Sequence, residues 1–117
     1  MYERGNLGRW GEAEAAKFLE AKGYQILVKN YRCRLGEIDL ICSWQGRLVF
    51  VEVKTRKSTT YGYPAEAVTK AKQEKIRLVA LSYLQETKAR YSSLAFDVVE
   101  IYWQMGHLVI NHLPKCF

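Results

Sequence analysis

The sequence is poor in the residues that hold small exported proteins together. It has three cysteines in 117 residues, Cys33, Cys42 and Cys116, with no CxxC pair. An odd number of widely spaced cysteines does not fit a fully paired disulfide framework, and the spacing matches no zinc-ligand pattern. We therefore expect a reduced, cytoplasmic protein.

Long apolar runs are also missing. No stretch approaches the roughly 18 apolar residues that a membrane span requires, and the N-terminus lacks the apolar core of a signal peptide. The composition, 49% hydrophobic and 26% charged, is that of a soluble globular protein. A chain of 117 residues can bury a core without disulfides. We expect one domain over residues 1–117 and no contact with a membrane.

Acidic residues are scarce in the segment from Lys54 to Arg77. Its seven basic and two acidic residues give 7 − 2 = +5 of the net charge of +6. A local excess of this sign favours a surface that binds phosphate, as in nucleic acids. The other interpretation is a solvated helix face followed by a basic loop.

The hydrophobic pattern predicts an α/β fold with the element order α-β-β-β-α-β-β. Apolar residues at helical spacing predict two helices, and alternating or continuous apolar runs predict five strands. Two of the strands, 37–44 and 48–53, are apolar on both faces, which is typical of the centre of a mixed sheet flanked by helices. The predicted helices are 7–22 and 64–86, and the predicted strands are 24–31, 37–44, 48–53, 95–103 and 107–113.

Charged residues interrupt these two central strands. If Gln45-Gly46 forms a two-residue hairpin loop, Asp39 lies opposite Glu52 and Glu37 lies opposite Lys54. Opposed carboxylates repel each other, so they must share a proton or be bridged by a divalent cation. Oxygen ligands without a nearby His or Cys favour Mg²⁺ or Mn²⁺. A buried network of ion pairs is the structural alternative.

Further charged residues would complete a phosphodiesterase site. Lys54 would activate water or stabilise the transition state, and Glu12 lies on the inner stripe of the first helix. In the basic loop after Lys54, Arg56 and Lys57 would bind backbone phosphates while Tyr61 or Tyr63 stacks on an unpaired base. The alternative for this loop is a mobile segment without fixed contacts.

These residues resemble two known groups of proteins. Glu12, Asp39 and the run Glu52-Val53-Lys54 resemble the PD-(D/E)XK nuclease superfamily, and within it the archaeal Holliday junction resolvases. The longer strings are similar, over almost the whole chain, to the YraN-like family of uncharacterised bacterial proteins. They are Gly8-Arg9-Trp10-Gly11-Glu12, Gly36-Glu37-Ile38-Asp39-Leu40-Ile41, Val51-Glu52-Val53-Lys54-Thr55-Arg56 and Phe96-Asp97-Val98-Val99.

The resemblance implies a restriction-endonuclease-like fold and a role for each site residue. Asp39, Glu52 and the Val53 carbonyl would bind the metal, Lys54 would be the catalytic lysine, and Glu12 an outer metal or water ligand. Lys72 and Gln73, on the inner stripe of the second helix, would reach the substrate phosphate or the site. A homodimer is expected if the protein follows the resolvases.

Two positions depart from the superfamily pattern. Ile38 stands where the superfamily name has proline, although many members lack that proline. Glu37 could form an ion pair with Lys54, which would weaken catalysis or position the lysine. We expect Asp97 to be a hydrogen-bonded structural acid, and His107 and His112 to be ordinary strand or loop residues.

Two functions are compatible with these residues. The first is a Mg²⁺-dependent endodeoxyribonuclease that cleaves branched or junction DNA in repair or recombination. The second is an inactive nucleic-acid-binding module with a nuclease fold, motivated by the contact expected between Glu37 and Lys54.

Overall fold

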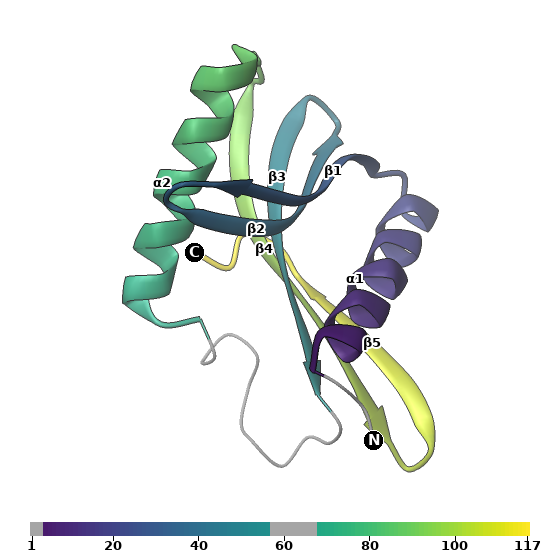
Figure 1. Ribbon diagram of the computed structural model, residues 1–117. Helices are drawn as coiled ribbons and strands as arrows, with labels where there is room; N and C mark the ends of the chain where they lie inside the picture. Colours follow the sequence, from purple (N-terminus) through teal and green to yellow (C-terminus); the bar gives the residue numbers. More distant parts are fainter. Residues whose placement is uncertain (1–3, 57–67) are drawn as a thin grey trace.

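A computed structural model describes residues 4–56 and 68–117 of the chain. These residues form two helices and five strands in the predicted order (Figure 1). The elements are α1 (Arg4–Ala21), β1 (Gln25–Cys33), β2 (Gly36–Trp44), β3 (Arg47–Arg56), α2 (Lys70–Thr87), β4 (Ser93–Gln104) and β5 (His107–Leu113). The predicted α/β class is confirmed.

The five strands form one mixed sheet with the order β1-β2-β3-β4-β5. Strands β3 and β4 are parallel, and the other neighbouring pairs are antiparallel. A parallel pair needs a long crossover connection, which contains α2 here. Strand β3 lies at the centre of the sheet, as its apolar residues on both faces predicted.

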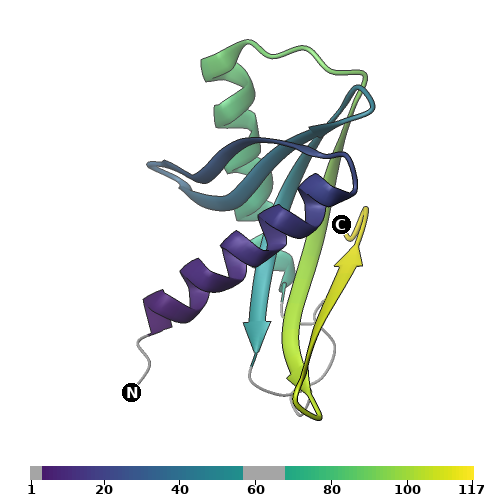
Figure 2. The ribbon, with the colours of Figure 1, turned by 90° about the vertical axis from the view of Figure 1, so that its right-hand side faces the viewer.

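The two helices cover opposite faces of this sheet (Figures 1 and 2). Because side chains alternate along a strand, Val49 and Val51 of β3 pack in the cluster under α1, whereas Leu48 and Phe50 pack in the cluster under α2. Leu19 of α1 is fully buried on its side of the sheet. Within the described residues, neither helix is long and apolar enough to cross a membrane.

Several element boundaries differ from the sequence prediction, and two of these differences concern β3 and α2. Thr55 and Arg56, expected in a loop, belong to β3 because the parallel strand β4 pairs with them. Helix α2 begins at Lys70 rather than near Pro64, and the Thr69 side chain accepts a hydrogen bond from the Lys72 backbone N–H as its N-cap. Lys57, Tyr61, Tyr63 and Pro64 lie outside the described residues.

Helix α1 lies close to the end of β3. A Cβ atom added at Gly11 would collide with the Thr55 side chain, whereas one added at Gly8 would meet no atom within 4 Å. Glycine at position 11 thus permits the close approach of helix and strand. The first turns of α1 are thereby placed beside the carboxyl end of β3.

Candidate active site

The candidate site forms where β2 separates from β3. The Gln45-Gly46 turn has positive φ at both residues, and the ladder runs from Trp44↔Arg47 to Leu40↔Val51. This is the register predicted for a two-residue loop. The ladder ends one pair before Asp39 and Glu52. Instead of pairing through its backbone, Asp39 accepts a 2.8 Å hydrogen bond at Oδ2 from the Val53 backbone N–H.

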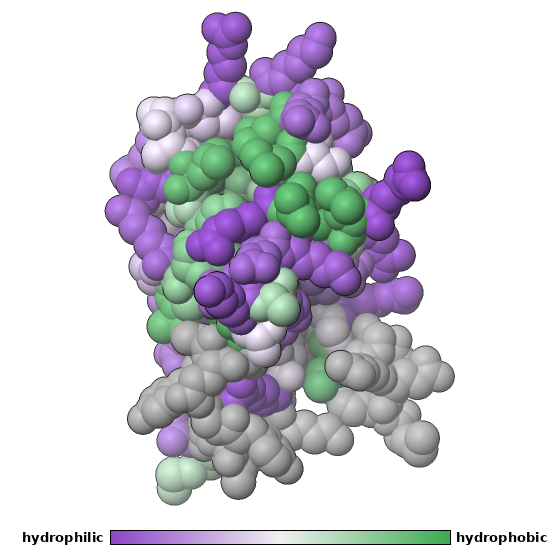
Figure 3. Space-filling view, turned by 90° about the vertical axis from the view of Figure 1, so that its left-hand side faces the viewer, coloured by the Kyte–Doolittle hydropathy of each residue, from purple (hydrophilic) through white to green (hydrophobic). Residues whose placement is uncertain are grey.

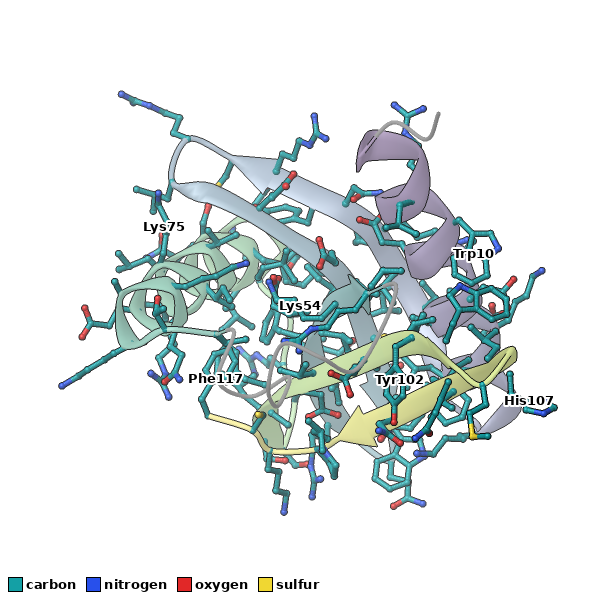
Figure 4. All side chains as sticks on the ribbon, turned by 90° about the horizontal axis from the view of Figure 1, so that it is seen from below. Trp10, Lys54, Lys75, Tyr102, His107 and Phe117 are labelled. Carbon is teal, nitrogen blue, oxygen red and sulfur yellow. The ribbon has the colours of Figure 1, made fainter. Side chains whose placement is uncertain are left out.

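A cavity of about 320 Å³ opens at this fork. Figure 4 shows Lys54 between the two helices, at the end of the sheet. Six residues singled out from the sequence line the cavity together, although they come from four elements: Glu12, Asp39, Glu52, Val53, Lys54 and Lys72.

The two central acids lie in an environment that disfavours their charge. Burial, together with the charge of the neighbouring Asp39, raises the pKa of Glu52 to about 7. Burial likewise raises the pKa of Asp39 to about 6, with an added contribution from Glu12, while the hydrogen bond from Val53 opposes the shift. Two carboxylates that share one buried site cannot both ionise without compensation.

Two lysines from different elements supply positive charge to the same cavity. Lys72 Nζ lies 3.7 Å from Glu52 Oε2. Burial and the nearby Lys72 ammonium lower the pKa of Lys54 to about 8. The N-cap of α2 fixes the first turn of the helix, so it also fixes the backbone from which Lys72 extends.

The donor set fits a hard divalent cation. Glu52 Oε1 is buried and has no hydrogen-bond partner in the described structure, so one acceptor in the cavity is unsatisfied. No three His, Cys, Asp or Glu side chains of the described segments gather as a metal-binding group. The oxygen donors of the predicted set are Asp39, Glu52 and the Val53 carbonyl, and Mg²⁺ is compatible with few protein ligands because it commonly keeps several waters in protein sites.

Other predicted residues do not reach the cavity. Gln73 lies in the first turn of α2, and its Nε2 donates a 3.0 Å hydrogen bond to the Val68 backbone carbonyl, just before the helix. Arg56 Nε lies 3.9 Å from Glu100 Oε2 on the neighbouring strand. The expected roles of Lys57 and Tyr61 fall on residues that the structure does not describe.

The prediction that Glu37 lies opposite Lys54 is wrong. Strand β2 pairs with β3 only from Leu40 to Trp44. The residues before Leu40 pair with β1 instead, where Glu37 lies opposite Arg32. Glu37 Oε2 accepts from Arg32 Nε at 3.0 Å. Glu37 still lines the cavity, but its ion pair is with Arg32.

Asp97 and His112 form a second buried polar cluster away from the cavity. Asp97 Oδ2 lies 2.6 Å from His112 Nε2, and Asp97 Oδ1 accepts from the Lys115 backbone N–H at 3.0 Å. The prediction of a hydrogen-bonded structural acid is confirmed, but His112 is not the ordinary residue we expected. The β4–β5 register, which pairs Val99 with His112, is the signal that would have placed His112 near Asp97.

Comparison with known proteins identifies the family of the chain. Proteins named UPF0102 protein from Syntrophomonas wolfei and Rhodococcus opacus are 46% and 50% identical to it, over 95% and 86% of the chain and 96% and 84% of their own lengths. One from Caldicellulosiruptor saccharolyticus is 46% identical over 90% of the chain and 89% of its own length. The family model described as "Uncharacterised protein family UPF0102" matches residues 11–101. The chain therefore belongs to this uncharacterised family.

Proposed function

We propose that the protein is a Mg²⁺-dependent endodeoxyribonuclease that cleaves branched or junction DNA in repair or recombination. The observation that carries the proposal is the convergence of two acids and two lysines in one cavity, although β2, β3 and α2 are separate in sequence. The resemblance to PD-(D/E)XK nucleases is consistent with this set of residues. The basic stretch from Lys54 to Arg77, which begins in β3 and continues into α2, supplies the positive charge that a DNA backbone requires.

Each residue of the cavity has a distinct chemical task in this proposal. Asp39, Glu52 and the Val53 carbonyl would hold the ion, which when bound polarises a phosphoryl oxygen and makes its bound water more acidic. The Lys54 ammonium stabilises negative charge on the phosphoryl oxygens in the transition state. Because its pKa is lowered to about 8, Lys54 can also exchange a proton near neutral pH.

Glu12 and Lys72 would position the attacking water and balance the charge of the cavity. Glu12 extends from α1 toward Asp39, where its carboxylate can accept a hydrogen bond from the attacking water. Lys72 balances the charge of Glu52 and provides a second cation for the phosphate. Removal of Lys72 should therefore weaken both substrate binding and the geometry around Glu52.

The test is a cleavage panel with labelled four-way junction, flap, single-stranded and linear duplex DNA, with Mg²⁺ or EDTA. Asp39→Asn and Lys54→Ala should abolish cleavage while DNA still binds in a gel shift. Glu14→Gln, which removes an acid of α1 paired with Lys17 on the helix surface, is the matched control and should cleave normally. Cleavage by Asp39→Asn at the normal rate would refute the site.

The inactive binding module is the alternative function. Its motivation was the neutralisation of Lys54 by Glu37, and the ion pair between Glu37 and Arg32 removes that argument. The module would be recognised by DNA binding that is sensitive to salt, unchanged by EDTA and never followed by cleavage.

A further inference from the structure

The β4–β5 hairpin projects past the end of β3. The last residue of β3, Arg56, pairs with Tyr102, but β4 continues to Gln104 before the Met105-Gly106 turn. Both ribbon views show the end of the hairpin extending beyond the sheet (Figures 1 and 2). Lys54 pairs with Glu100, so the hairpin extends about 13 Å beyond the catalytic level, at roughly 3.3 Å per residue.

Large apolar side chains gather on this projection. Met105 is 92% exposed, Trp103 is 44% exposed and Leu108 is 36% exposed. Trp103 and Leu108 are cross-strand partners, and Trp10 of α1 stacks on Trp103 with ring centroids 5.9 Å apart. We call Trp10, Trp103, Met105 and Leu108 the hairpin patch. Exposed apolar groups that gather in one place commonly mark a binding surface.

Exposed apolar residues also occur elsewhere in the described structure. Leu78 and Leu81 on the outer side of α2 are about half exposed. Figure 3, which views the molecule from the α2 side, shows apolar side chains grouped in the upper half of this face with hydrophilic ones around them. These leucines therefore provide a control for the loss of apolar surface away from the hairpin.

The hairpin patch and the catalytic cavity share the same part of α1. Gly8 and Glu12, which line the cavity, flank Trp10 in sequence, although helical spacing directs the Trp10 side chain to a different side of α1. The stacked tryptophans thus connect the hairpin to the helix that carries Glu12. Exposed Arg9 and His107 adjoin the patch in sequence. This setting suits a polyanion that occupies the cavity and continues along the hairpin.

We propose that the hairpin patch is a wedge that inserts between bases at a DNA branch point while a phosphate occupies the cavity. The inference rests on the proposed nuclease function and specifies its substrate. Proteins use Met, Leu and other apolar wedges to separate stacked base steps. The offset of about 13 Å corresponds to roughly four base steps of 3.4 Å. Because bases at a branch are already poorly stacked, insertion there costs less than in a continuous duplex.

The test uses a junction with 2-aminopurine at the branch point, whose fluorescence rises when the base unstacks. The protein carries Asp39→Asn, so that it binds without cutting, and is compared with the same protein carrying Met105→Ala and Leu108→Ala. The fluorescence rise should fall about tenfold in the hairpin variant, as expected for loss of an inserted wedge. Binding to linear duplex should change less than about twofold, since phosphate contacts dominate duplex affinity. Leu81→Ala in the Asp39→Asn background should behave as its parent.

The outcomes separate the wedge from the nuclease proposal. If the protein with native Asp39 cleaves the junction but the hairpin variant gives an unchanged fluorescence rise, the wedge is refuted and the nuclease stands. If no DNA is bound or cut, both fail. Light scattering supplies a second criterion: if the hairpin substitutions convert a dimer to a monomer, the patch is a contact between copies and the wedge is refuted.

Discussion

Glu52 is the residue whose surroundings differ most from water within the candidate site. Its side chain is buried, Oε1 has no hydrogen-bond partner in the described structure, and its pKa is raised to about 7 by burial and by Asp39. The folded protein therefore keeps protons that the unfolded chain releases at lower pH. The same acids that make the cavity suitable for a cation cost stability when no cation is bound.

This cost predicts how stability changes with pH. Between about pH 4.5 and pH 7 the folded state binds more protons than the unfolded state, so the free energy of unfolding should fall as pH rises. Glu52→Gln should reduce this slope and raise the free energy of unfolding at pH 8 by up to about 3 kcal/mol, since the pKa rises from 4.5 to about 7 and each pKa unit corresponds to about 1.4 kcal/mol. Urea denaturation across this pH range, without divalent cations, measures both effects. Glu14→Gln is the control, and a Glu52→Gln protein less stable than wild type at pH 8 would contradict the prediction.

Mg²⁺ should offset the stability that the protein loses when Asp39 and Glu52 ionise. A cation binds the ionised carboxylates, so it should raise the melting temperature at pH 8 far more than at pH 5, where the two acids retain their protons. Thermal melts with and without Mg²⁺ measure the difference. Glu52→Gln should lose most of the effect, and an equal shift at both pH values would argue against cation binding by these acids.

At the scale of elements, the site depends on α1 lying against the carboxyl end of β3. Gly11 permits this approach because a Cβ atom there would collide with Thr55, whereas the same atom at Gly8 meets nothing within 4 Å. The two glycines occupy one helix, three residues apart. They therefore form a matched pair for testing the packing.

Gly11→Ala and Gly8→Ala should change stability in opposite directions. At position 11 the overpacked contact should cost about 1–3 kcal/mol. At position 8 the better helix propensity of alanine should leave the free energy of unfolding unchanged or raise it by up to about 1 kcal/mol. Chemical denaturation of both variants measures the pair, and similar values for the two would mean that α1 does not pack on Thr55.

How much could be predicted from the sequence differs between these elements. The Gln45-Gly46 turn and the alternation of apolar residues predicted the β2–β3 register and the common face of Asp39 and Glu52, since both signals are local. The partner of Glu37 was mispredicted because it depends on where β2 leaves β3 while remaining paired with β1. Thr55 and Arg56 join β3 through pairing with β4, which follows them by more than 40 residues. Such distant partners leave no local pattern.

At the scale of the whole molecule, two buried polar clusters have contrasting environments. In the cavity of the candidate site an acid oxygen lacks a hydrogen-bond partner among the described residues, whereas both Asp97 oxygens are hydrogen-bonded, one to His112 and one to the Lys115 backbone. Lys22 Nζ, just after α1, lies 2.7 Å from His112 Nδ1. These contacts link β4, β5 and the end of α1. We therefore expect them to stabilise the fold.

Asp97→Ala should therefore destabilise the protein, in contrast to Glu52→Gln. The substitution leaves the buried His112 Nε2 without its hydrogen-bond partner, and an unsatisfied buried polar group typically costs about 1–3 kcal/mol. Denaturation at pH 7 measures the loss, and DNA cleavage well below the melting temperature should persist because Asp97 does not line the cavity. A variant as stable as wild type would show that the Asp97–His112 contact contributes little.

The sharpest test of the proposed nuclease site is the single-turnover rate of four-way junction cleavage by wild type and Glu52→Gln in Mg²⁺. The wild-type protein should cut the junction, and Glu52→Gln should be slower by about a hundredfold to a thousandfold, the scale on which loss of one preorganised polar group acts in hydrolytic sites. The same variant should be more stable than wild type without metal, so misfolding would not explain the loss. Cleavage by Glu52→Gln at the wild-type rate would contradict the assignment of this cavity as the active site.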